Sequence, residues 1–117
     1  MPQTEPALLR ERFVHSFLSL VILSILQRRP SFGYEIMTII NEEYGVFVSA
    51  GSLYPILYQL DAVGLVTGAW DEPGKKVRKI YKLTPGGSEA VERGLGAITA
   101  VLSSLKSNGG NGARKVS

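Results

Sequence analysis

Positive charge and tyrosine side chains gather in one stretch of this sequence, residues 49–84. Five cations lie within eight residues that contain no acidic residue: Lys75, Lys76, Arg78, Lys79 and Lys82. Just upstream, serine, tyrosine and glutamine side chains follow a helical spacing. Lysine and arginine neutralise phosphates, and such contacts supply the salt-dependent, sequence-independent part of nucleic-acid affinity. The residue types therefore favour binding to a polyanion, and a merely solvated basic loop is the alternative interpretation.

Residues for catalysis or metal binding are sparse. The sequence has no cysteine and a single histidine, His15, so it offers no thiolate nucleophile, no disulfide and no Cys/His zinc site. It also lacks a plausible nucleophile–base pair, a carboxylate pair and a phosphate-binding glycine loop. We therefore predict no catalytic residue, no metal and no cofactor, and we do not expect an enzyme.

Length and composition fit one small cytoplasmic domain. The chain has 117 residues, is 44% hydrophobic and carries a net charge of +3, so it can build only a small core, and chains of this size often gain stability by association. The most apolar run, residues 17–26, is about half as long as a membrane span requires. No cleavage site follows it. We expect a soluble protein without a membrane partner.

Three helical patterns precede the five cations at residues 75–82 and must position them. Residues 8–29 carry apolar side chains on two faces, so this helix needs cover on both sides. Ser31 is a candidate N-cap for a second helix, from Phe32 to about residue 43, that ends at Gly45. A third helix begins between Ser49 and Ser52 and ends at Gly64. Its core stripe consists of Leu53, Ile56, Leu57, Leu60 and Val63.

A hairpin and a last helix follow. Residues 65–71 and 77–83 have the composition of strands, and the turn signal at residues 71–74 predicts a protruding loop between them. Thr84 and Pro85 open the last helix as N-cap and first residue. Its apolar residues recur at steps of four and three, a heptad seam: Val91, Leu95, Ile98, Leu102 and Leu105. Residues 1–7 and 108–117 are expected to be disordered tails.

The order of elements predicts a winged helix-turn-helix fold, mainly α with a two-stranded wing. Residues 8–84 would form the DNA-binding domain with its N-terminal helix, and residues 85–107 a dimerisation helix. In such a fold the second helix of the helix-turn-helix enters the major groove, and the wing contacts neighbouring phosphates or the minor groove. The seam could instead pack inside its own monomer. We favour a dimer, with an interface that includes Phe17, Val21, Val91, Leu95, Ile98, Leu102 and Leu105.

Several motifs resemble the PadR family of bacterial and archaeal transcription regulators. They are FGYEI at 32–36, GSLYPIL at 51–57 with Leu60, GLV at 64–66 and RKIYKLT at 78–84. The likeness covers about residues 8–105, and the short C-terminal helix is similar to the smaller branch of that family. It implies a homodimer that binds a pseudo-palindromic operator on double-stranded DNA, usually as a repressor and often released by a small-molecule effector.

The sequence departs from the family pattern in two places. Family members commonly carry a basic residue after the Leu-Tyr-Pro element, where this chain has Tyr58 and Gln59. Multidrug-binding members stack flat ligands on an aromatic residue of the last helix, and residues 84–117 contain none. That mode of drug binding is therefore not expected here.

We predict DNA contacts from two groups of residues. The helical group is Tyr34, Ser49, Ser52, Tyr54, Tyr58 and Gln59, and the wing group is Lys75, Lys76, Arg78 and Lys79. Tyr34 and Tyr54 fit core packing as well as DNA contact, and Trp70 fits a core or hinge position better than a ligand platform. A protein-interaction module with a winged helix and no DNA binding remains the alternative function, because the third helix is almost uncharged.

Overall fold

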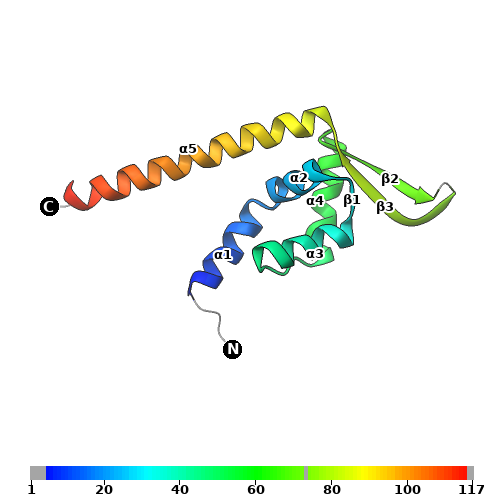
Figure 1. The fold of residues 1–117 in the computed structure, drawn as a ribbon, viewed down its shortest axis with the longest axis horizontal. Helices are drawn as coiled ribbons and strands as arrows, with labels where there is room; N and C mark the ends of the chain where they lie inside the picture. The colour runs from blue at the N-terminus through cyan, green and yellow to red at the C-terminus, as the bar shows by residue number, and fades with distance from the viewer. Residues whose placement is uncertain (1–4, 73, 116–117) are drawn as a thin grey trace.

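The structure, a computed structural model, describes residues 5–72 and 74–115 and is mainly helical with one small antiparallel sheet (Figure 1). The elements in chain order are α1 (Glu5–Ser16), α2 (Leu18–Arg28), β1 (Ser31–Phe32), α3 (Gly33–Tyr44), α4 (Ala50–Ala62), β2 (Val66–Glu72), β3 (Lys75–Leu83) and α5 (Pro85–Lys115). This is the predicted winged helix-turn-helix, with α3 and α4 as its two helices and β2–β3 as its wing.

The single helix predicted over residues 8–29 is two helices. The chain bends at Phe17, whose ψ of 24° leaves the helical range, although Phe17 N still donates to Phe13 O at 3.0 Å and Val21 N to Phe17 O at 2.9 Å. Ser16 Oγ donates to the carbonyl of Arg12 at 2.8 Å, and such back-bonding by a serine often bends a helix. α2 is the central element, with six of its residues buried: Leu18, Val21, Ile22, Leu23, Ile25 and Leu26.

The sheet has a third strand that the sequence did not reveal. β1 pairs with β3, with Ser31 opposite Tyr81 and Phe32 opposite Ile80, and the strand order is β1-β3-β2. Ser31 is therefore a strand residue, and the expectation that it caps the second helix is wrong. Phe32 is the N-cap residue of α3, and its backbone N–H donates to Glu35 Oε1 at 2.8 Å.

The helix-turn-helix packs as the apolar spacing predicts, with one exception. Ile36 and Ile40 of α3 are fully buried, and so are Leu53 and Leu57 of α4, whereas Val63 is exposed. Val63 lies outside the core because it is the C-cap residue of α4 and has left the helical conformation. Gly45 ends α3 with a φ of 66°, the left-handed C-cap that glycine favours.

The wing is a tight hairpin and not the long loop predicted. β2 runs to Glu72 and β3 begins at Lys75, with Glu72 paired to Lys75 and an irregularity in the register between Trp70 and Glu72. Gly74 adopts a φ of 82°, which a turn between two strands requires and glycine accepts at no steric cost. Pro73 lies outside the described residues. The basic residues are thus strand residues of a continuous hairpin.

α5 begins as predicted, with Pro85 as its first residue and the Thr84 hydroxyl accepting from Gly87 N at 3.0 Å. It continues to Lys115, beyond the predicted end at residue 107, because adding a residue to an existing helix is far easier than starting one. Of the two expected tails, residues 1–4 and 116–117 lie outside the described residues, and residues 5–7 and 108–115 are helical. Gly94 lets α5 approach α2, since a Cβ there would meet Leu20 Cδ1 at 2.9 Å.

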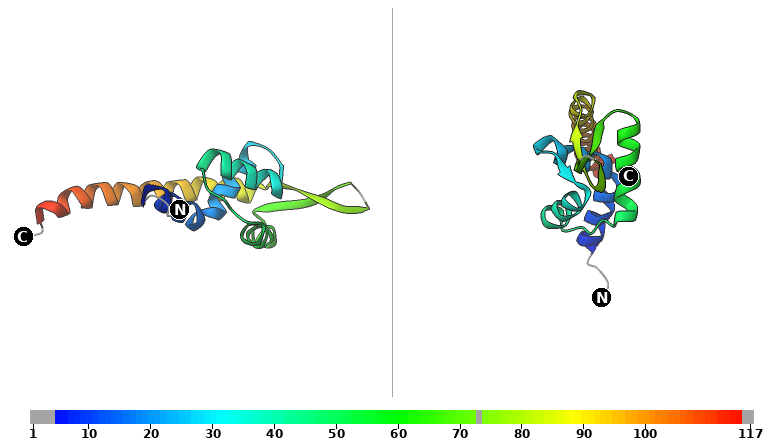
Figure 2. Two further views of the ribbon diagram at one scale, coloured as in Figure 1. Left: turned by 90° about the horizontal axis from the view of Figure 1, so that it is seen from below. Right: turned by 90° about the vertical axis from the view of Figure 1, so that its right-hand side faces the viewer.

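The molecule is elongated, with extents of 68 × 39 × 20 Å. α5 runs away from the domain at one end of the long axis, and the β2–β3 hairpin projects at the other (Figure 2). Among residues 5–72 and 74–115, no helix has both the length and the apolarity to cross a membrane.

Candidate nucleic-acid interface

The start of α4 is fixed by its N-cap. The Ser49 hydroxyl accepts from Ser52 N at 3.2 Å and also donates to Ser52 Oγ at 3.2 Å. The two serines predicted as DNA contacts therefore bond to each other in this structure. α4 begins at Ala50, between Ser49 and Ser52 as the sequence predicts, and Pro55 lies in its second turn. Farther along, Tyr58 is 77% exposed and Gln59 is exposed as well, which leaves both side chains available on the outer face of α4.

Tyr54 connects the two helices of the helix-turn-helix. Its ring lies directly against Gly33, the first residue of α3, where a Cβ would be 2.5 Å from the hydroxyl oxygen and 2.7 Å from Cε1 and Cζ. Only a residue without a side chain leaves space for this ring. The ring remains partly exposed, so Tyr54 combines the two roles that the sequence left open, packing and availability at the surface.

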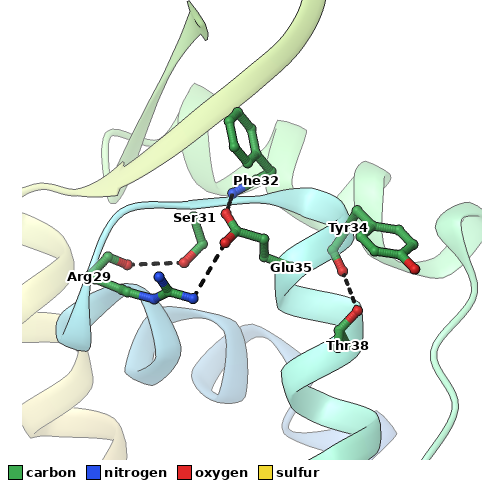
Figure 3. A network of polar contacts seen from close by, with 6 residues as sticks. All are labelled: Arg29, Ser31, Phe32, Tyr34, Glu35 and Thr38. Atoms are coloured by element: carbon green, nitrogen blue, oxygen red, sulfur yellow. Dashed lines mark hydrogen bonds and ion pairs between the residues drawn. The ribbon is translucent and has the colours of Figure 1, made fainter.

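The first turn of α3 is held by a polar network in which Tyr34 takes part through its backbone carbonyl, which accepts from Thr38 Oγ1 at 3.0 Å (Figure 3). Glu35 accepts from the backbone N–H of Phe32 and from Arg29 Nη2, the latter at 3.4 Å. Ser31 Oγ donates to the carbonyl of Arg29 at 3.2 Å. Tyr34 lies on the other side of this turn from Arg29 and is 74% exposed. It is therefore a surface residue and not part of the core.

Two acids lie against the basic wing, although the basic stretch contains none in sequence. Lys75 Nζ is 3.3 Å from Glu72 Oε2, and Arg78 Nη2 is 3.2 Å from Asp71 Oδ2. Strand pairing brings these partners from β2 to β3 across the hairpin. Within the part of the chain that the structure describes, Lys76, Lys79 and Lys82 form no ion pair. The positive field of the wing is therefore weaker than the sequence run suggests.

Aromatic rings support two of the wing cations. The Arg78 guanidinium carbon lies 4.2 Å from the centroid of the Phe32 ring, and Lys79 Nζ lies 5.3 Å from that of Trp70. Both distances are within the range of cation–π attraction. Trp70 is partly exposed and its ring lies against the Lys79 ammonium, so the core position expected for it is wrong.

These side chains line one surface cleft between the first turn of α3, the start of α4 and the middle of the wing. Its lining residues are Phe32, Gly33, Tyr34, Tyr54, Trp70, Val77, Arg78 and Lys79. The cleft combines two cations with two tyrosine hydroxyls, a set of donors suited to phosphate or base oxygens. Tyr81 of β3 is buried, and burial raises the pKa of its hydroxyl above the ordinary value.

In the described part of the chain, no group of three or more His, Asp or Glu side chains could hold a metal ion.

Four predicted DNA-contact residues lie around the cleft: Tyr34, Tyr54, Arg78 and Lys79. Lys75 and Lys76 lie farther out on the hairpin, and Tyr58 and Gln59 farther along α4.

The predicted dimer seam divides into a buried and an open part. Val21 and Val91 are buried in this chain, where α5 packs on α2, so they already have partners. Phe17, Leu95, Leu102 and Leu105 are 43%, 50%, 50% and 64% exposed, and Ile98 is partly buried. Together with Phe13 and Leu20, Phe17, Leu95 and Ile98 line an open apolar groove between α1–α2 and α5. The described structure of one chain leaves this groove uncovered.

Two residues of the interface escaped sequence reasoning. Phe32 is predicted as the first residue of the second helix and Asp71 as a turn residue, yet both contact Arg78. The signal that could have revealed Asp71 is hairpin pairing, which places residue 71 near residue 78 when the connecting turn is tight. No local pattern marks Phe32, because its partner lies 46 positions later.

Comparisons with known proteins agree on a family. A model of the transcriptional regulator PadR-like family matches residues 22–93. The transcriptional regulator Rv3488 of Mycobacterium tuberculosis is 33% identical over 73 residues, which cover 59% of this chain and 68% of that protein.

Solved structures extend the likeness to the fold. A PadR family transcriptional regulator from Eggerthella lenta is 26% identical with a TM-score of 0.74, over 82% of this chain and 84% of that one. Bacillus subtilis PadR, solved in complex with operator DNA, is 30% identical with a TM-score of 0.60, over 67% of this chain and 45% of that one.

Proposed function

This chain belongs to the PadR-like family of transcriptional regulators, and from that membership we propose that it is a cytoplasmic, homodimeric repressor that binds a pseudo-palindromic operator. The family and the structural neighbours are regulators and not enzymes. The observation that carries the proposal is the cleft in which Tyr34, Tyr54, Arg78 and Lys79 converge from α3, α4 and the wing. A related protein of the same fold is bound to operator DNA.

In this proposal α4 enters the major groove and the wing contacts the flanking backbone. The outer face of α4 offers Tyr58 and Gln59, both exposed, and a glutamine amide can pair with both hydrogen-bonding groups of an adenine edge. α4 contains a single charged residue, Asp61, so the phosphate contacts come from elsewhere. The unpaired wing lysines supply them, and affinity and base selection are divided between the two elements.

The open part of the seam supports the proposed dimer. α5 carries a heptad row of exposed leucines that one chain leaves uncovered, and Phe17 lines an apolar groove together with the first of them, Leu95. A second copy related by a two-fold axis would cover both rows. It would also place the two α4 helices about 34 Å apart, or a multiple of that distance, the spacing of successive major grooves on one side of DNA.

The test is binding to DNA at several salt concentrations. Duplexes that tile the promoter region of the gene for this chain are labelled and titrated with purified protein, with fluorescence anisotropy as the readout. We expect one tile to bind preferentially, with an association constant that falls steeply as salt rises, and a footprint with two half-sites. A folded dimer that shows no salt-sensitive binding to any tile would overturn the proposal.

A protein-interaction module is the second candidate, and the nearly uncharged face of α4 favours it. It predicts that reversing the charge of Lys76 and Lys79 together leaves the biological activity intact. The DNA-binding proposal predicts the opposite, a loss of regulation of a reporter gene behind the preferred tile. The same double variant serves both hypotheses, and circular dichroism confirms that it is folded.

A further inference from the structure

We propose that Arg78 is the residue of the wing that selects DNA sequence, and that Asp71 and Phe32 position it for that role. The inference rests on the proposed DNA binding and adds to it a residue-level account of specificity. It concerns one arginine among five wing cations, four of which are lysines. The structure treats this arginine differently from the lysines.

Arg78 is held on two sides. The guanidinium carbon lies over the Phe32 ring, 4.2 Å from its centroid, and Nη2 donates to Asp71 Oδ2 at 3.2 Å. A guanidinium is planar and carries five N–H donors in a fixed fork. One contact to the face and one to Nη2 fix the plane and its rotation, and the remaining donors stay available because the side chain is 61% exposed.

The anchor of this arrangement belongs to the helix-turn-helix and not to the wing. Phe32 is the N-cap residue of α3, its N–H is bonded to Glu35, and it pairs with Ile80 on β3. Arg78 is therefore held against the end of α3, close to Tyr54 of α4 in the same cleft. Its position relative to α4 is therefore set by the contact with Phe32 at the end of α3 and by the ion pair with Asp71 across the hairpin.

A fixed arginine and a mobile lysine do different work on DNA. A lysine ammonium is a point charge that neutralises phosphates of any sequence. A guanidinium held in one plane can donate two hydrogen bonds to one base edge, which discriminates between base pairs. Asp71 contributes a second effect, because its negative charge weakens the attraction of the wing for phosphates of every sequence. Both effects of Asp71 raise the preference for the operator over other DNA.

The experiment compares Asp71→Asn with Glu72→Gln. Both remove one wing acid and the ion pair it makes, but only Asp71 contacts Arg78. Affinities are measured for a duplex isolated by binding selection from a random library and for a scrambled duplex of equal length. Each variant should bind the scrambled duplex about two- to fivefold more tightly, the effect of one exposed charge. The ratio of the two affinities should fall about tenfold in Asp71→Asn and stay unchanged in Glu72→Gln.

Two further variants separate positioning from charge. Arg78→Lys keeps the charge, and Phe32→Leu keeps the apolar volume but removes the ring. Each should relax the preference at one base pair of the half-site, found by substituting every position of the selected duplex, while the slope of affinity against salt stays unchanged. If both acid variants shift the two affinities equally, or if Arg78→Lys keeps every base preference, the inference is wrong.

An NMR measurement without DNA tests the positioning directly. Relaxation of the Arg78 Nε–Hε group should report a side chain that is ordered in the wild type and mobile in Asp71→Asn. A wild-type protein that binds no duplex would contradict the proposed function and leave this measurement unaffected. Equal mobility of Arg78 in the two proteins would overturn the positioning whatever the DNA measurements give.

Discussion

Replacing Leu102 by aspartate separates the proposed dimer from the fold of one chain. Leu102 lies in the middle of the open seam of α5 and is 50% exposed. It is not among the residues of the hydrophobic core. A charge at this position leaves the monomer almost untouched and disturbs only what covers the seam.

The size of the effect follows from exposure and symmetry. Full burial of a leucine side chain stabilises by about 1.5–3 kcal/mol, so covering the exposed half contributes about 1 kcal/mol per copy. A two-fold axis places the substitution in the interface twice, which removes about 2 kcal/mol. Leaving a polar group without a partner costs a further ~1–3 kcal/mol for each copy. A total of about 4–8 kcal/mol corresponds to a dimer dissociation constant raised about a thousandfold or more.

Sedimentation velocity over a range of concentrations measures the association, and thermal denaturation measures the fold. We expect monomers at concentrations where the wild type is a dimer, with a free energy of unfolding of the monomer within about 0.5 kcal/mol of that of the wild-type chain, as for most surface substitutions. Ser103→Asp is the control, because it adds the same charge one residue away, outside the seam. An intact dimer of the Leu102→Asp variant, or equal dissociation of both variants, would refute the pairing through α5.

Three other substitutions test the proposed DNA-binding surface and the packing of α5 against Leu65. Gly33→Ala should displace the Tyr54 ring and weaken operator binding about two- to tenfold, the net value of one hydrogen bond, with little change in melting temperature. Gly87→Ala should lower the melting temperature by at least about 5 °C, because the added methyl group meets the carbonyl of Leu65 and overpacks the junction. Lys76→Gln should weaken binding to every duplex equally, with a salt slope smaller by about one in anisotropy titrations.

One of these three substitutions has a matched control, and each has a result that would contradict it. Gly96→Ala is matched to Gly87→Ala, since nothing lies within 4 Å of a Cβ at Gly96, and it should stabilise α5 by up to about 1 kcal/mol. A similar loss of stability in both alanine variants would contradict the steric argument. For Gly33→Ala the contradicting result is unchanged operator affinity, and for Lys76→Gln it is an altered preference between duplexes.

Local rules predicted the parts of the fold that depend on neighbours in sequence. The start of α4 between Ser49 and Ser52, the end of α3 at Gly45 and the start of α5 at Thr84 and Pro85 all hold. Each depends on hydrogen bonds between residues at most four positions apart. Except at Val63, the core stripe of α4 holds for the same reason, because a helix presents residues three and four apart on one face.

The features that the sequence did not reveal depend on distant partners. β1 is two residues long and has no periodicity of its own, since it exists only through its pairing with Ile80 and Tyr81. The ion pair between Asp71 and Arg78 depends on a tight turn between β2 and β3, whereas the residue pattern predicted a longer loop there. We attribute the bend at Phe17 to the Ser16 hydroxyl, which bonds to the carbonyl of Arg12. The spacing of apolar residues gives no sign of such a bond.

The contact between Gly33 and Tyr54 sets a rule for retargeting this protein to new DNA. Residue 33 cannot be enlarged while Tyr54 keeps its position, because the volume of its side chain and that of residue 54 share one space. A library in which both positions change together, with a larger residue 33 beside a smaller residue 54, would contain binding surfaces that single-site libraries miss. Tyr58 and Gln59 carry no such constraint and can be randomised first.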